Sequence, residues 1–236
     1  MKVCTDACLF GGLLAISFAA GEVKRVLDIG TGTGLLALMY AQKNPHAIID
    51  AVEIDEAAAQ QAKENFQESP WKERLHIHNT SIQQFSNITQ PPNQLTHPQI
   101  NSSIIKYNLV ISNPPFFEND LMSKNTKRNL ALHSSELSLE ELLDAIIKFL
   151  KEDGSFAVLL SYHRAEQFIN LATERSFYLT AKILVKQTPQ HNYFRSVLFF
   201  SKKLTQTKNS EIIIQNKDGK YTNAFVELLK DYYLHL

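Results

Sequence analysis

The sequence predicts an α/β protein whose mostly parallel sheet is covered by helices on both faces. Apolar runs with strand character alternate with longer helical runs over most of the 236 residues. A glycine-rich turn follows the first of these strands, and the last two long strands lie close enough in sequence to form an antiparallel hairpin. Because parallel neighbours need a crossover connection, this alternation indicates a parallel sheet. We expect seven strands, ending in a C-terminal antiparallel hairpin.

The expected elements follow one another without a linker or an internal repeat. Strands are expected at residues 23–29, 47–54, 74–78, 106–112, 155–161, 179–186 and 194–201, with a further short strand at 211–214. Helices are expected from the glycine-rich turn through Lys43 and at residues 56–68, 137–150, 164–173 and 223–232. Asp55 is placed to cap the helix at 56–68, and Ser138 with Glu141 is typical of a capping box.

The domain organisation predicted from these elements is a single domain over residues 1–236. Residues 86–105 are polar and without periodicity, so we expect an inserted loop there. A second polar stretch at 117–135 is expected to form a lid. Residues 202–236 are expected to form a C-terminal extension.

Composition is that of an ordinary globular protein, with 44% hydrophobic and 10% aromatic residues. The formal net charge is zero, which argues against nonspecific nucleic-acid binding by the whole surface. Residues 182–220 nevertheless hold eight Lys and Arg against two acids. This segment is either a phosphate-contacting edge or a solvated surface hairpin. The candidates for phosphate contacts are Arg195, Lys202, Lys203 and Lys208.

Cysteine usage and hydropathy indicate the cellular compartment. Cys4 and Cys8 lie one helical turn apart, so we expect small buried residues on one helix face and no disulfide framework. No apolar run reaches the length of a transmembrane helix, and the first residues lack the pattern of a signal peptide. We expect a cytoplasmic protein.

The glycine-rich turn, Asp28-Ile-Gly30-Thr-Gly32-Thr-Gly34, predicts a cofactor site. Glycines let the backbone approach a ligand closely, and the following helix N-terminus offers unpaired N–H groups. A carboxylate at Asp28 would repel a pyrophosphate, which disfavours a nicotinamide dinucleotide, but it suits a ligand that carries an ammonium or sulfonium group. Glu53, 23 residues after Gly30, stands where a carboxylate can bind two ribose hydroxyls.

The third predicted strand contributes to the same site. Ser81 and Ile82 follow it, where the adenine ring of a nucleoside cofactor would rest. Together with the acid at the glycine turn and the acid of the second strand, they point to S-adenosyl-L-methionine as the cofactor.

Asn113-Pro114-Pro115-Phe116 follows the fourth predicted strand and suits the activation of a planar exocyclic amine. The side-chain oxygen of Asn113 and the carbonyl of Pro114 could each accept one N–H bond, which would free the lone pair of the nitrogen. Proline fixes φ and has no N–H group, so the turn is stiff and offers acceptors. Phe116 could stack on the base. The alternative is a plain strand-ending turn, for which Asn-Pro and Pro-Pro are common signals.

These motifs resemble class I methyltransferases that act on an amino or amide nitrogen. The opening Met1-Lys-Val-Cys-Thr-Asp6, the segment 129–142 and the closing segment 221–234 are similar to a narrower group, the tRNA1(Val) (adenine-37-N6)-methyltransferases. The likeness covers nearly the whole chain. It implies a Rossmann-like class I methyltransferase fold, S-adenosyl-L-methionine as methyl donor, tRNA as partner, no membrane and a monomer.

The resemblance also implies roles for single residues. Asp28, Gly30 and Gly32 would line the methionine end of the cofactor, and Thr5 and Asp6 would close over it. Asn113 and Pro114 would bind the target amine. Family members often carry an acid where Ser81 stands, and they usually have a further segment before Met1.

Three other functions remain open at this point. An N2-guanine RNA methyltransferase can share the Asn-Pro-Pro-Phe turn. A glutamine N5-methyltransferase acting on a release factor is disfavoured by Phe116, because those enzymes favour Tyr there. A noncatalytic RNA-binding or assembly factor on this fold is the third alternative.

Overall fold

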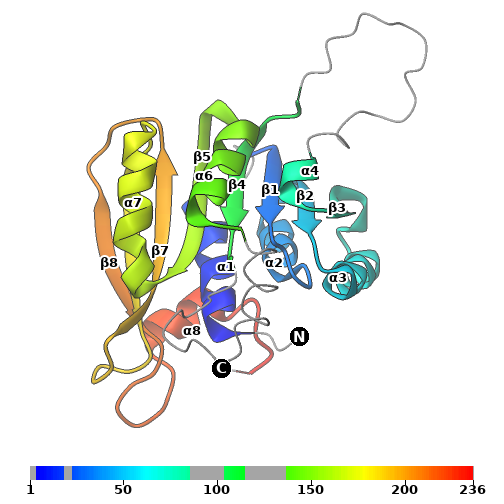
Figure 1. The fold of residues 1–236 in the computed structure, drawn as a ribbon. Coiled ribbons are helices and arrows are strands. Elements are labelled where there is room, and N and C mark those ends of the chain that lie inside the picture. The colour runs from blue at the N-terminus through cyan, green and yellow to red at the C-terminus, as the bar shows by residue number, and fades with distance from the viewer. Residues whose placement is uncertain (1–3, 19–22, 86–103, 115–136, 236) are drawn as a thin grey trace, which may run out of the picture.

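The computed structural model describes residues 4–18, 23–85, 104–114 and 137–235 (Figure 1). The lid expected at 117–135 lies outside these residues, and so does the loop expected at 86–105, except for its last two positions. Pro115 and Phe116 are outside them as well.

The described residues form one eight-stranded sheet in the order β3-β2-β1-β4-β5-β7-β6-β8. The five strands from β3 to β5 pair in parallel, and β7 is antiparallel to both of its neighbours, β5 and β6. The predicted fold class and the antiparallel hairpin are therefore confirmed, but the expected number of seven strands is one too few. The eighth strand comes from the tail and pairs in parallel with β6. The strands are β1 (Arg25–Ile29), β2 (Ile48–Glu53), β3 (Leu75–Asn79), β4 (Tyr107–Ser112), β5 (Leu150–Ser161), β6 (Tyr178–Lys186), β7 (Tyr193–Ser201) and β8 (Lys208–Ile213).

Helices cover both faces of the sheet, as Figure 1 shows with α6 and α7 in front and α1 and α2 behind. One apolar layer takes residues from α1, α2, α3 and α8, and the other takes residues from α4, α6 and α7. No helix within the described part of the chain is long and apolar enough to cross a bilayer. The helices are α1 (Thr5–Ser17), α2 (Leu35–Lys43), α3 (Glu56–Glu68), α4 (Ile82–Phe85), α6 (Leu139–Phe149), α7 (Ala165–Glu174) and α8 (Asn223–Leu229), with 3₁₀ turns η1 (Lys72–Arg74) and η2 (Tyr162–Arg164).

Both predicted helix caps are present. Asp55 Oδ1 accepts from the backbone N–H of Ala58 at 2.8 Å, which satisfies one free donor at the start of α3. The hydroxyl of Ser138 accepts from the N–H of Glu141, and the Glu141 carboxylate accepts from the N–H of Ser138. The capping box therefore fixes where α6 begins, and α6 turns its apolar side toward the sheet.

Helix α1 packs closely against α2 and α8 through two adjacent glycines. A Cβ on Gly11 would lie 2.5 Å from Met39 Sδ, and one on Gly12 would lie 3.0 Å from carbons of Leu228 and Leu229. The glycines thus let the backbone of α1 approach α2 and α8 more closely than a residue with a side chain would allow.

The expectation for the two cysteines is half right. Cys8 is buried in α1, but Cys4 precedes the first turn of the helix as its N-cap residue and is exposed. The reason is that α1 begins at Thr5, so Cys4 precedes the helix and does not share the buried face on which Cys8 lies.

Candidate active site

The carboxyl ends of β1, β2 and β4 meet at one edge of the sheet. Ile29 pairs with Val52 on one side and with Ser112 on the other. The N–H groups of Gly30 and Thr31 both donate to Val52 O, at 2.9 and 3.1 Å, and the hydroxyl of Ser112 donates to Ile29 O at 2.8 Å. These bonds bring the glycine turn, the acid that ends β2 and the Asn-Pro turn to the same edge, where open α/β sheets bind their ligands.

Asp28 is fully buried at the end of β1. One carboxylate oxygen accepts from the Thr31 hydroxyl at 2.6 Å, while Oδ1 is buried without a hydrogen-bond partner among the described residues. Burial raises the pKa of Asp28 to about 7, and the nearby Glu53 charge adds to the rise against the opposing Thr31 bond. A positive group beside Oδ1 would relieve this destabilised charge.

The three glycines of the turn have positive φ angles of 70°, 59° and 86°. Side-chain-bearing residues rarely adopt this conformation. A Cβ on Gly34 would also lie 2.4 Å from the Phe66 ring. At Gly30, in contrast, no atom of the described residues lies within 4 Å of the Cβ position, so these residues leave open space above the backbone next to Asp28.

Glu53 ends β2 and is only 9% exposed. The N–H of Gly32 donates to Oε2 at 2.8 Å, and the N–H of Asp55 donates to Oε1 at 2.9 Å. Two backbone bonds therefore fix the orientation of the carboxylate. Each oxygen keeps further lone-pair capacity for a hydroxyl donor.

S-adenosylmethionine fits these residues. Its cationic methionine end matches the unpartnered oxygen of Asp28, its atoms can occupy the space above Gly30, and its ribose hydroxyls match the fixed carboxylate of Glu53.

Asn113 and Pro114 follow β4 directly and are half-buried. Asn113 Oδ1 is buried and has no hydrogen-bond partner among the described residues. A buried amide oxygen without a partner is unusual, because native structures satisfy most such groups. The oxygen is thus available to accept an N–H bond from a ligand at this edge.

Comparison with known proteins gives a consistent result. The family described as "Methyltransferase small domain" matches residues 11–169. A tRNA1(Val) (adenine(37)-N6)-methyltransferase of Cytophaga hutchinsonii is 38% identical, with 100% of this chain and 92% of the relative aligned. A protein of the same name from Yersinia pestis is 34% identical, with 100% and 88% aligned.

The chain belongs to the tRNA1(Val) (adenine(37)-N6)-methyltransferase family. It is a class I methyltransferase whose methyl donor is S-adenosyl-L-methionine.

Solved structures agree on the fold of the methyltransferase. A structure described as a predicted O-methyltransferase from Agrobacterium tumefaciens has a TM-score of 0.65 at 14% identity, and 98% of each chain is covered. TrmN from Thermus thermophilus has a TM-score of 0.52 at 19% identity, with 83% of this chain and 48% of that chain covered.

The residues predicted on the adenine side of the cofactor lie at the start of α4. Ser81 Oγ accepts from the N–H of Gln84 at 3.3 Å, so it contributes to capping this short helix. Ile82 is 6% exposed and belongs to the apolar layer that includes Phe85. Thr80 N–H donates to Glu53 O at 3.0 Å, which ties this segment to the end of β2. Ser81 and Ile82 remain predicted cofactor residues.

Thr5 and Asp6 lie in the first turn of α1. Asp6 is 9% exposed, and its carboxylate accepts from Arg195 Nε of β7 at 2.8 Å. The sequence suggested Arg195 as a phosphate contact, but its Nε bonds to Asp6, 189 positions away. This pair anchors the start of α1 to β7 in the methyltransferase.

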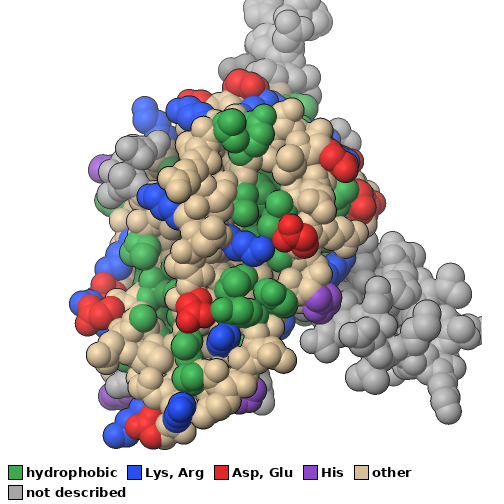
Figure 2. Space-filling view, turned by 90° about the vertical axis from the view of Figure 1, so that its left-hand side faces the viewer, with side chains coloured by type: hydrophobic (Ala, Val, Ile, Leu, Met, Phe, Trp, Pro, Cys, Tyr) green, Lys and Arg blue, Asp and Glu red, His purple; other side chains and the backbone are tan. Residues whose placement is uncertain are grey.

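The basic segment 182–220 carries less free charge than its composition indicates. Three of its lysines meet acids from other elements: Lys182 pairs with Glu166, Lys186 with Glu211 and Lys202 with Glu152. Figure 2 shows Lys and Arg side chains interspersed with Asp and Glu side chains on this side of the molecule. Lys203 and Lys208 are exposed. We therefore see no one-sign patch on the face shown.

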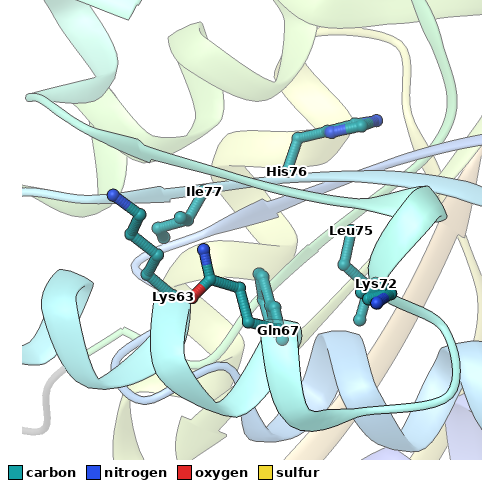
Figure 3. A pocket seen from close by; sticks show the side chains of 7 residues that line it. Lys63, Gln67, Lys72, Leu75, His76 and Ile77 are labelled. Carbon is teal, nitrogen blue, oxygen red and sulfur yellow. The ribbon is translucent and has the colours of Figure 1, made fainter.

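A cavity of about 290 Å³ lies between α3 and the edge strand β3. Its lining is Lys63, Phe66, Gln67, Lys72, Leu75, His76 and Ile77. Figure 3 shows Leu75 and Ile77 on the side of β3 that faces α3 and His76 on the other side, as expected for alternating strand side chains. None of the predicted site residues lines this cavity.

Sequence reasoning missed two residues that shape the site. Thr31 donates to Asp28, and Ser112 links β4 to β1. The signal for Thr31 was available, since a hydroxyl three residues after a strand-ending acid is within reach of its carboxylate. No local signal identified Ser112, because its partner is 83 positions away.

Proposed function

We propose that this methyltransferase methylates N6 of an adenine in tRNA, at position 37 of valine tRNA. The observation that carries the proposal is the buried side-chain oxygen of Asn113 at the end of β4, which has no partner among the described residues and lies on the same edge as Asp28 and Glu53. The family supports the choice of substrate, because relatives that align over the full chain bear this activity in their names.

In this proposal Asn113 and Pro114 activate the target nitrogen. An aromatic amine is a poor nucleophile because its lone pair is delocalised into the ring. Asn113 Oδ1 and the Pro114 carbonyl each accept one N–H bond, which pulls the nitrogen toward tetrahedral geometry. The same acceptors stabilise the positive charge that develops on the nitrogen. Pro115 completes the stiff turn and Phe116 stacks on the adenine, as the sequence predicts.

The cofactor residues hold the donor in line with this nitrogen. Asp28, Gly30 and Gly32 receive the methionine end, and Glu53 binds the ribose hydroxyls. Thr5 and Asp6 flank the methionine end from α1, and Ser81 with Ile82 borders the adenine. S-adenosylmethionine, when bound, supplies a methyl group whose departure needs no acid catalysis. The protein then contributes mainly orientation, which is worth up to roughly 7 kcal/mol of barrier in favourable cases.

An adenine in a tRNA loop suits this reaction because it is already exposed. An adenine in a loop is already unpaired, so moving it into a site is less costly than extrusion from a helix. We propose that the chain acts as a single domain over residues 1–236, as a monomer, in the cytoplasm. Light scattering of the purified protein tests the oligomeric state.

The test uses tRNA from cells that lack this protein, the purified chain and labelled S-adenosylmethionine. Nucleosides of the product are separated by mass. Label in N6-methyladenosine is expected, and mapping within valine tRNA then identifies the position. Label in N2-methylguanosine, or no label although the cofactor binds, would refute the proposal.

A further inference from the structure

A pair of tyrosines lies at the same sheet edge as the Asn-Pro turn. Strand β5 pairs in parallel with β4, and Tyr162 follows its last residue. Strand β7 is antiparallel to β5, with Arg195 opposite Ser161, so Tyr193 at its start lies at this edge too. Figure 1 shows the turn between β6 and β7 at the lower edge, toward which the arrows of β4 and β1 point. The two tyrosines therefore lie at the same edge of the sheet as the candidate active site, one and two strands away from β4.

The two rings contact each other outside the packed layers. Their centroids are 5.4 Å apart with an interplanar angle of 33°. Tyr162 is 44% exposed, and neither ring belongs to either apolar layer of the core. Core packing therefore does not explain this pair, and Tyr162 offers apolar ring surface to solvent.

Neighbouring groups hold Tyr193 in place. Its hydroxyl donates to Glu211 Oε2 at 2.7 Å, and Lys186 Nζ lies 4.3 Å from the centre of its ring. Lys186 and Glu211 also lie 3.8 Å apart, so the acid is already occupied by two partners. A ring fixed in this way gives Tyr162 a rigid support.

The cations around the pair favour an anionic backbone. Lys186 lies against the Tyr193 ring, and Arg164, two residues after Tyr162, is half-buried without an ion-pair partner among the described residues. Glu211 is the opposing charge, and its bonds to Tyr193 and Lys186 limit its effect. Aromatic side chains with adjacent cations are the arrangement that binds single-stranded nucleic acid.

We propose that Tyr162, supported by Tyr193 and Lys186, is a stacking site for an unpaired nucleotide of the RNA substrate beside the target adenine. The inference rests on the proposed function. Stacking on an aromatic ring is tolerant of sequence, since every base has a π-face. The pair thus contributes to RNA binding and not to the methyl-transfer step.

The experiment compares three variants with the wild type. Tyr162→Ala removes the ring, Tyr162→Phe keeps it, and Tyr178→Ala is the control. Tyr178 begins β6 opposite Ser201, at the other edge of the sheet. For each protein, the Kd for unmethylated tRNA, the KM for tRNA and kcat are measured at saturating S-adenosylmethionine.

Tyr162→Ala is expected to raise Kd and KM for tRNA by roughly 5- to 100-fold, with kcat within about twofold of the wild type. Tyr162→Phe and Tyr178→Ala should bind tRNA as the wild type does. Unchanged tRNA binding by Tyr162→Ala would overturn the inference, and so would a loss of kcat with KM unchanged. Because tRNA binding is measured separately from methylation, a wild type that binds tRNA but forms no N6-methyladenosine refutes the proposed function alone.

Discussion

The cofactor half of the sheet and its C-terminal half differ in how charged side chains find partners. At the ends of β1 and β2, Asp28 and Glu53 are buried, and one oxygen of Asp28 has no partner among the described residues. In the C-terminal half, basic side chains such as Lys182 and Lys202 are matched by acids of other elements. The protein thus leaves a carboxylate oxygen unsatisfied where a ligand is expected, while these lysines of the C-terminal half have acidic partners.

This difference shows which kind of charge indicates function. A segment with a high formal charge can be neutralised by distant parts of the chain, so its composition alone does not locate a binding site. A buried carboxylate oxygen without a partner is costly unless a ligand satisfies it, so at the ligand-binding edge of the sheet Asp28 is the more informative feature.

The largest effect is expected for Asn113→Ala. Removing one preorganised polar partner of a transition state lowers kcat by roughly 10²- to 10³-fold. Binding of S-adenosylmethionine, measured by calorimetry, should stay within about twofold, because the proposed role of Asn113 is to bind the target amine and not the cofactor. Asn209→Ala, at an exposed position of β8, is the control. Loss of cofactor binding in Asn113→Ala would show that the Asn-Pro turn has been assigned the wrong role.

The second prediction compares a mostly buried ion pair with an exposed one. Arg195→Met deprives the nearly buried Asp6 carboxylate of its partner and should lower the free energy of unfolding by about 2–4 kcal/mol. Lys202→Met breaks an exposed pair with Glu152 and should change it by less than about 1 kcal/mol. Urea unfolding measures both. Equal effects of the two substitutions would show that burial does not decide how much each ion pair contributes to stability.

The third prediction uses two glycines with similar backbone angles. Gly34→Ala adds a Cβ that meets the Phe66 ring, while Gly219→Ala adds one in open space. Positive φ alone costs about 1–2 kcal/mol for a residue with a Cβ. We expect that loss for Gly219→Ala and about 2–3 kcal/mol for Gly34→Ala, because strain adds to crowding.

A second substitution identifies the cause of the larger loss. If crowding is responsible, Phe66→Leu should be less destabilising in the Gly34→Ala background than in the wild type. Additive effects in urea unfolding would leave backbone strain as the explanation.

The smallest predicted effect is the pH dependence of cofactor binding. The pKa of Asp28 is raised to about 7, and a bound cation lowers it, so binding releases a proton. Affinity should therefore rise by up to roughly tenfold per pH unit below pH 7 and level off above it. Calorimetry from pH 5.5 to 8.5 measures the profile. Asp28→Asn should bind more weakly with a flatter profile, and an unchanged slope in this variant would rule out Asp28 as its source.

The same group has a predictable effect on stability without cofactor. Its pKa in the folded state, about 7, lies above the ordinary value of 3.8. Between these values the folded state binds more protons than the unfolded state, so the contribution of Asp28 to the free energy of unfolding falls as pH rises. In urea unfolding, the free energy of unfolding of the wild type minus that of Asp28→Asn should therefore fall as pH rises from about 4 to about 7.

Local patterns predicted much of the fold and part of the site. The helix caps at Asp55 and Ser138 depend on residues three positions away, and both were placed correctly. The alternation of strands and helices also gave the sheet class. The prediction was weaker for the C-terminal tail. Its strand joins the sheet by pairing with β6, and whether the edge of β6 is free for it depends on distant parts of the chain.

What the sequence by itself determined was the class of fold, the family and which side chains stand at the carboxyl ends of β1, β2 and β4. Each of these depends on residues that are near neighbours along the chain. Tertiary structure alone decided the bond between Asp6 and Arg195, the raised pKa of Asp28 and the contact between Tyr162 and Tyr193. Burial and pairing depend on segments far apart in sequence, which come together only when the sheet forms.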